Sequence, residues 1–169
     1  MAIDFGAGLE QRLGAIMSAR AGGISQAPYA HCNLGDHVQD DPLAVAHNRE
    51  VFAVQLQARP AWLTQVHGNR VIRLTHGASG GDLFNPADLN GSRGQPEADG
   101  ALTTEPGLAC TVMVADCLPL LLAAPEGRGV AALHAGWRGL AGAGAMAGRG
   151  IVHTGVAALC EAASCDPDR

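Results

Sequence analysis

Basic clusters and long apolar runs are both missing from this 169-residue sequence. It holds 11 Lys and Arg against 16 Asp and Glu, a formal net charge of −5, with the basic residues scattered. Nucleic acids and anionic membranes are bound by clustered basic faces, so we exclude both as main partners. No apolar stretch approaches the length of a membrane span, and residues 1–20 lack the pattern of a secretory signal. We therefore expect a cytoplasmic protein.

Aromatic residues are also scarce, at 4% of the chain. With 47% hydrophobic and 16% charged residues, the composition is that of a globular protein with an aliphatic core. The length fits one ordinary domain, and 23 Gly and 9 Pro indicate many turns. The five cysteines are odd in number and irregularly spaced, so we expect no disulfide framework: Cys32, Cys110, Cys117, Cys160 and Cys165.

A helix is predicted over residues 41–58, after a turn-rich and polar segment over 19–42 that is typical of a functional loop. Asp41 is a favourable N-cap, and Pro42 suits the first helical position. The spacing of apolar residues predicts a buried stripe made of Val45, Val51, Val54 and Leu56.

The remaining segments predict strands and one further helix. Residues 61–74 contain two apolar runs split by "HGN", which indicates a hairpin or a strand–turn–strand unit. Residues 76–100 have the composition of a long surface loop, residues 100–125 alternate strands with turns, and residues 127–139 form a strand ending in a turn. The Ala- and Gly-rich segment from Leu140 to Ser164 is most simply helical. Consecutive strands without intervening helices favour a mixed sheet over a doubly wound one.

Three residues with chemical potential lie beside strand-like runs: His67 in "TQVHG", Cys117 in "VADC" and His134 in "ALHAG". One thiolate and two imidazoles are suitable zinc ligands, and three protein ligands leave a fourth position open, as in a catalytic site. The separations of 50 and 17 positions match no local ligand motif. From spacing alone, a core thiol with two hydrogen-bonded histidines explains the pattern better.

Two other functions are compatible with the same trio. Cys117 activated by His134 would be a nucleophilic thiolate–imidazolium pair. Two His and one Cys with a weak axial ligand would form a blue-copper site. The trinuclear cluster of a multicopper oxidase needs His-x-His pairs, and no two of the seven histidines are two apart, which argues against laccase chemistry: His31, His37, His47, His67, His76, His134 and His153.

Four polar residues are further candidates for the site. Asp116, next to Cys117, is either a solvated turn residue or a group that supports a ligating histidine or transfers a proton. Arg138 offers a fork of donors suited to phosphate, against a surface role that is equally compatible. Arg49 and Asn33, taken alone, are better explained as structural residues.

Four segments together resemble a known family: "NLGDHVQDDPLAVAHNR", "WLTQVHGNRV", "EADGALTTEPGLACTVMVADCLPLLL" and "VAALHAGWRGLAGAG". In this order they are similar to the laccase-domain or "polyphenol oxidase" family, whose members are described as purine nucleoside phosphorylases. Adenosine deaminase and methylthioadenosine phosphorylase activities are also attributed to them. The similarity runs from about residue 20 to residue 144, and its "ADCLP" and "HAGWRG" boxes are specific.

The resemblance implies a single α/β domain in which mixed sheets are flanked by helices in an α/β/β/α arrangement. It also implies a metal, zinc with copper as the alternative, held by His67, Cys117 and His134. The implied reaction is attack of phosphate on the anomeric carbon of adenosine, inosine, guanosine or methylthioadenosine. Arg49 and Arg138 would contact anion or ribose, Asn33 would contact substrate, and Asp116 would serve in acid–base work.

The resemblance implies a longer protein, of which roughly a further third would follow residue 169. The resemblance therefore implies that residues 1–169 form one laccase-like domain that lacks its C-terminal third. Unpaired sheet edges would then favour weak self-association over a strict monomer. A shortened chain acting as an inactive binding domain is a further alternative.

Overall fold

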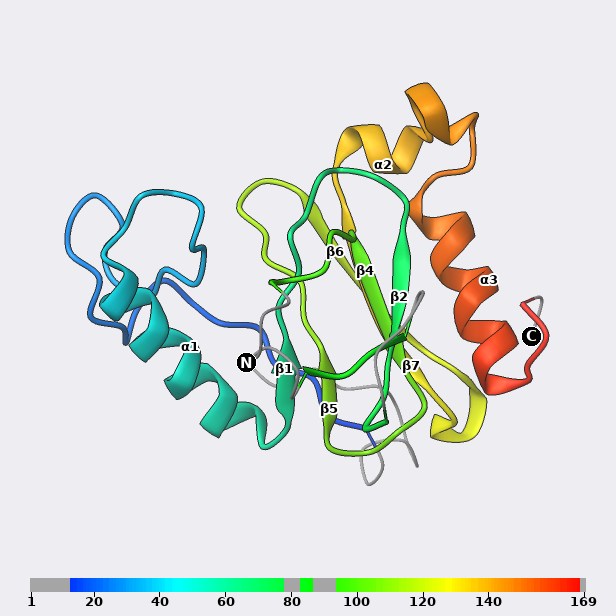
Figure 1. Ribbon diagram of the computed structural model, residues 1–169, viewed down its shortest axis with the longest axis horizontal. Coiled ribbons are helices and arrows are strands. Elements are labelled where there is room, and N and C mark those ends of the chain that lie inside the picture. The colour runs from blue at the N-terminus through cyan, green and yellow to red at the C-terminus, as the bar shows by residue number, and fades with distance from the viewer. Residues whose placement is uncertain (1–12, 78–82, 87–93, 168–169) are drawn as a thin grey trace. The chain divides into compact units, whose positions relative to one another are not determined.

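The computed structural model describes residues 13–77, 83–86 and 94–167 (Figure 1). The chain divides into two units with dense internal packing, Met1–Ala58 and Arg59–Arg169. Each unit is described here by itself.

Helix α1 (Pro42–Leu56) is the regular element of the first unit. It begins as predicted, because the Asp41 carboxylate accepts a hydrogen bond from Leu43 N at 2.9 Å. Its buried residues are Ala44, Val45 and Asn48. Val54 is 72% exposed, so its place in the predicted apolar stripe was wrong. The polar Asn48 occupies a buried position instead, and it binds the loop that precedes the helix.

The second unit contains two sheets. Strands β1 (Arg59–Ala61) and β5 (Leu108–Cys110) pair in parallel. The other sheet has five strands in the order β3-β2-β4-β7-β6, with parallel pairing of β2 with β3 and β4 and antiparallel pairing of β7 with β4 and β6. Its strands are β2 (Val71–Leu74), β3 (Leu83–Phe84), β4 (Gly100–Thr103), β6 (Leu118–Ala123) and β7 (Val130–Ala135).

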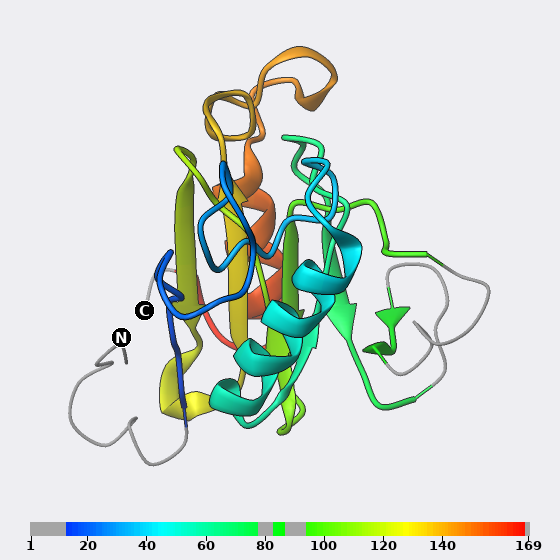
Figure 2. The same ribbon diagram turned by 90° about the vertical axis from the view of Figure 1, so that its left-hand side faces the viewer.

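The two faces of the five-stranded sheet bury different partners, because adjacent residues of a strand point to opposite faces. Ala101 packs with residues of β1 and β5, whereas Leu102 packs with residues of helix α3 (Ile151–Ala163). Figures 1 and 2 show α3 running along the sheet on the face opposite β1 and β5. The predicted class, a mixed α/β fold with mixed sheets flanked by helices, is confirmed.

Of the two alternatives predicted for residues 61–74, a hairpin or a strand–turn–strand unit, the hairpin was wrong. Strands β1 and β2 belong to different sheets, and each finds its partner far along the sequence, Arg59 opposite Leu108 and Val71 opposite Gly100. The residues between them are held by remote contacts, including the Thr64–Glu97 bridge. A short turn signal such as "HGN" does not reveal such contacts.

The surface loop predicted for residues 76–100 was wrong in two of its described stretches, whereas His76 and Gly77 are exposed and irregular as expected. Strand β3 lies within it and buries Phe84, and Ala98 and Asp99 are fully buried directly before β4 begins at Gly100. Residues 78–82 and 87–93 of this segment lie outside the described residues.

The helix predicted from Leu140 is interrupted. A short helix α2 (Trp137–Ala141) replaces the turn predicted after β7, and α3 begins only at Ile151. Glycines between them adopt left-handed backbone, with φ of 61° at Gly142 and 81° at Gly148, which a continuous right-handed helix forbids. Single-turn 3₁₀ segments cover Pro125–Gly127 and Gly144–Met146.

Helices in the described residues are too short or too polar to cross a lipid bilayer.

Candidate metal centre

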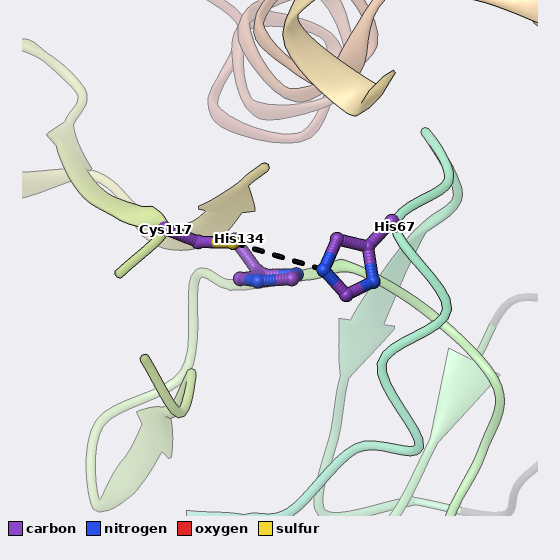
Figure 3. A group of neighbouring side chains, drawn as sticks. All are labelled: His67, Cys117 and His134. Carbon is purple, nitrogen blue, oxygen red and sulfur yellow. Dashed lines mark hydrogen bonds between the residues drawn. The ribbon is translucent and has the colours of Figure 1, made fainter. Parts of the chain in front are cut away.

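His67, Cys117 and His134 converge at one end of the five-stranded sheet (Figure 3). His134 is the fifth residue of β7, and Cys117 directly precedes β6, whose Leu118 lies opposite Ala135 in the antiparallel ladder. The pairing of two strands thus places the thiol beside the imidazole, although they are 17 positions apart. His67 reaches the same point from the loop between β1 and β2. The sequence prediction that these three residues form one site is supported by their placement.

The spacing of the three side chains suits a metal ion. Their ligand atoms all lie within 4.8 Å of one another. Cys117 Sγ and His67 Nε2 are 3.7 Å apart, and tetrahedral zinc with ordinary Zn–S and Zn–N bonds would separate such atoms by about 3.6 Å. The two imidazole rings meet edge to face, with centroids 4.7 Å apart.

Burial is graded across the cluster. His134 is only 4% exposed, Cys117 is half-buried and His67 is exposed. One side of the cluster is therefore accessible from solvent. Catalytic metal sites share this feature, because a substrate or water fills the position that the protein leaves open.

A buried carboxylate orients the deepest ligand. Asp99 is fully buried and lies with Oδ1 at 2.8 Å from His134 Nδ1. Burial opposes ionisation of Asp99, but hydrogen bonds from His134 and from three backbone N–H groups outweigh it, so the pKa of this carboxyl lies below its ordinary value. An ionised carboxylate only accepts hydrogen bonds, so Nδ1 of His134 carries a proton, and in the neutral ring Nε2 keeps its lone pair for a metal.

The sequence reasoning missed Asp99. Asp116 was offered as one possible support for a ligating histidine, whereas in the described residues the carboxylate bonded to a ligand histidine is Asp99. The available signal was local: Asp99 lies in "EADG", directly before a strand that begins with Gly100. Because the preceding segment is rich in Gly, Asn and Pro, the residue was grouped with a surface loop.

Gly136 makes room for the cluster. A Cβ added there would lie 2.6 Å from His67 Cδ2 and 3.2 Å from Cys117 Sγ. Contacts below 3.0 Å force atoms to shift, so any side chain at position 136 would displace a candidate ligand. The Gly of the "HAGW" segment is therefore required by a close approach and not by its backbone, whose φ is −69°.

Two of the other predicted site residues are chain neighbours of the cluster. Asp116 is exposed and directly precedes Cys117. Arg138 is exposed in helix α2, four positions after His134.

Asn33 and Arg49 lie in the first unit and are tied to its backbone. The Asn33 side chain closes a turn with Gly35 and donates to Asp40 Oδ2 at 3.0 Å. Arg49 Nε donates to Leu34 O at 2.8 Å, and its Nη1 lies 3.3 Å from a carboxylate oxygen of Asp36. These contacts give both residues a structural role in shaping their loop.

Comparison with known proteins identifies the family. Residues 14–169 match the family described as "multi-copper polyphenol oxidoreductase laccase". The chain belongs to this family. The resemblance expected from the "ADCLP" and "HAGWRG" boxes is thereby confirmed.

Several members have been named for an activity or solved as structures. A protein of Pseudomonas aeruginosa named purine nucleoside phosphorylase is 45% identical over 130 residues, covering 77% of this chain and 47% of the relative. Escherichia coli YfiH, named likewise, is 43% identical over 128 residues, covering 75% and 47%. The crystal structure of a Neisseria meningitidis protein of family DUF152 matches with a TM-score of 0.74 at 36% identity, covering 94% of this chain and 56% of that one. The chain thus spans about half the length of the curated relatives it matches.

Proposed function

We propose that this protein takes part in metal-dependent phosphorolysis of purine nucleosides. In this reaction phosphate attacks the anomeric carbon, and base and pentose 1-phosphate are released. The observation that carries the proposal is the convergence of His67, Cys117 and His134 on one accessible point. It is supported by the relatives, which are named purine nucleoside phosphorylases.

Zinc is the proposed metal, with copper as the alternative. Tetrahedral coordination by one thiolate and two imidazoles is typical of zinc, and the chain has no His-x-His pair of the kind that builds a trinuclear copper cluster. When bound, such an ion supplies a Lewis acid that holds and polarises a substrate oxygen. His67, Cys117 and His134 would hold it, with Asp99 fixing the orientation of His134.

Other residues of the chain would bind and orient the substrates. The exposed guanidinium of Arg138 is the proposed phosphate contact, because a planar fork of N–H donors matches phosphate oxygens. Asp116 is the proposed proton donor to the departing base, since it is accessible and next to Cys117. Arg49 and Asn33 are retained as candidate ribose or anion contacts.

Adenosine, inosine, guanosine and methylthioadenosine are the proposed substrates. Adenosine deamination, a cytoplasmic location and a monomeric or weakly self-associating state stay predictions that the family resemblance and the composition supply.

The test is an assay of the full chain with inosine, with and without phosphate, alongside metal analysis. We expect release of hypoxanthine that depends on phosphate, and one zinc per chain. The matched variants are Cys117→Ala and Cys160→Ala, which remove half-buried thiols inside and outside the cluster. The first is expected to lose metal and activity together, and the second to keep both.

Each alternative function predicts a different outcome of this assay. Cleavage of inosine by a metal-free chain would contradict the role of the metal. Bound copper with strong visible absorption from a Cu–thiolate bond would favour the redox function over phosphorolysis. A chain that binds zinc but releases no base from any of the four nucleosides would favour an inactive binding domain.

A further inference from the structure

We propose that Asp99 is a positioning residue that fixes both histidine ligands of the candidate metal centre at once. It sets the ring tautomer of His134, and it holds the backbone of His67 in the conformation that turns that ring toward Cys117. This inference rests on the metal site of the proposed function, but not on the reaction assigned to it.

The Asp99 carboxylate accepts four hydrogen bonds from two directions. Oδ1 lies 2.8 Å from His134 Nδ1 and 2.8 Å from the backbone N of His67. Oδ2 lies 2.6 Å from the N of Gly68 and 3.2 Å from the N of Val66. Three consecutive amides and one imidazole thus share a single fully buried carboxylate.

The position of the carboxylate is itself fixed by the sheet. Asp99 N donates to Arg70 O at 3.0 Å, and His134 N donates to Asp99 O at 2.7 Å. The backbone of Asp99 therefore continues the β4–β7 ladder directly opposite the residue that its side chain orients. Because the backbone of Asp99 is bonded on one side to Arg70 and on the other to His134, its carboxylate has little freedom to move away from either histidine.

His67 needs such support because its backbone is in the left-handed region, with φ of 60°. A residue with a Cβ disfavours this conformation. Three successive N–H groups that point to one carboxylate offset the cost, because hydrogen bonds to an ionised group are stronger than neutral ones. Strain of this kind is typical of functional sites, where the surrounding structure holds a residue in place.

The loop of His67 has another anchor, which holds Asn69, two positions after the ligand. Thr154 Oγ1 donates to Asn69 O at 2.7 Å, and Asn69 Nδ2 donates to Arg149 O at 2.6 Å. These contacts tie the loop to the start of α3. Within the described hydrogen bonds, the group that reaches the backbone of His67 itself is Asp99.

Replacement of Asp99 by Asn changes the hydrogen bonds that the side chain can make but keeps its size. The amide has the size of the carboxylate, but its NH₂ group must replace either Oδ2, which faces the N–H groups of Val66 and Gly68, or Oδ1, which faces His134 Nδ1 and the N–H of His67. All of these groups are donors in the present structure. The less unfavourable choice puts NH₂ in place of Oδ1, because it then opposes one backbone N–H instead of two, and His134 Nδ1 must accept. The proton moves to Nε2, and the imidazole loses the lone pair that a metal requires.

The first measurement is ¹⁵N NMR of the histidine ring nitrogens in the metal-free protein. We expect His134 of the natural chain to carry its proton on Nδ1, and His134 of Asp99→Asn to carry it on Nε2. Glu97→Gln is the matched control, an exposed carboxylate two positions earlier, and is expected to keep the natural tautomer. A proton on Nε2 in the natural chain would overturn the proposal without any variant, so a failure of Asp99→Asn to fold leaves it decidable.

The second measurement is zinc affinity by competition with a chelator. Loss of a carboxylate that supports a metal-bound histidine lowers affinity about 10- to 100-fold, and we expect this loss in Asp99→Asn and less than about twofold in Glu97→Gln. Equal zinc affinity in folded Asp99→Asn and the natural chain would overturn the proposal. Absence of inosine phosphorolysis, with tautomer and affinity as expected, would count against the proposed reaction and not against this role of Asp99.

Discussion

Two buried polar residues, Asp99 in the second unit and Asn48 in the first, each organise an irregular stretch of backbone. Asn48 is fully buried in helix α1 and is saturated with hydrogen bonds. Its Nδ2 lies 2.9 Å from Ser25 Oγ, 2.9 Å from Asn33 O and 3.3 Å from His31 O, while its Oδ1 accepts from Ile24 N at 3.0 Å. The residue thus holds both arms of the loop before α1.

The two centres differ in what they hold. Three of the four partners of Asn48 are backbone groups, and the fourth is a serine hydroxyl. The partners of Asp99 include the ring of one candidate ligand and the backbone of another. Its hydrogen bonds therefore orient two imidazoles that could bind a metal. A buried, hydrogen-bonded polar side chain therefore indicates an ordered backbone, whereas a functional role depends on whether the groups that it binds are themselves reactive.

The largest expected effect comes from a substitution of Asn48, which should lower stability without changing the metal centre. Asn48→Ala removes four hydrogen bonds and leaves buried groups without their partner, so we expect a loss of about 2 to 4 kcal/mol in the free energy of unfolding. Urea titration followed by circular dichroism measures it. Zinc stoichiometry should be unchanged, since all three ligands lie in the other unit.

Gln55→Ala, at an exposed position of the same helix, is the control and should change stability by less than about 0.5 kcal/mol. If Asn48→Ala is no less stable than Gln55→Ala, the buried amide does not organise the loop.

The next effect comes from a substitution beside the metal centre, which should lower the affinity for zinc. Gly136→Ala places a methyl group against His67 and Cys117, so we expect zinc affinity to fall about 10- to 100-fold, as for other changes that misplace a ligand. Chelator competition measures the affinity. Gly94→Ala, where a Cβ meets no atom within 4 Å, should leave it unchanged. Unaltered zinc binding in Gly136→Ala would show that the ligands do not need this close approach.

The smallest effect concerns Glu105, a half-buried carboxylate that also binds a backbone N–H group. Glu105 accepts from His76 N at 2.8 Å and from Thr75 Oγ1 at 3.0 Å, and these bonds hold its pKa below the ordinary value. Its contribution is therefore present above the ordinary carboxyl pKa of about 4.3 and is lost as the pH falls through the lowered value.

Glu105→Gln should accordingly be slightly less stable than the natural chain at pH 7, and this difference should vanish in acid. Glu161→Gln, on the exposed face of α3, serves as the control for loss of one charge. A stability difference that grows as the pH falls would contradict the assigned direction of the pKa shift.

The features that depend on neighbouring residues in the sequence could be predicted from it. Asp41 and Pro42 begin α1 because capping depends on adjacent residues alone. Most strands of residues 100–135 were found, because their apolar runs are bounded by turn residues. The trio of His67, Cys117 and His134 was found from residue types beside strands, and the family boxes joined them.

Long-range pairing could not be predicted in the same way. The partner of β1 is almost 50 positions away, so its neighbour in sequence, β2, was the more obvious choice. Asp99 is buried only because the β4–β7 ladder and the loop of His67 close over it. The local signal, the position of Asp99 in "EADG" directly before a strand, does not contain that information.

The most direct test of the central claim is the zinc content of the purified chain and of Cys117→Ala, measured by mass spectrometry of the metals and by chelator competition. The account predicts one tightly bound zinc per natural chain, none retained by Cys117→Ala, and an unchanged content in Cys160→Ala. A natural chain that takes up no zinc, or a Cys117→Ala chain that binds it as tightly, would show that these three residues do not form a metal centre.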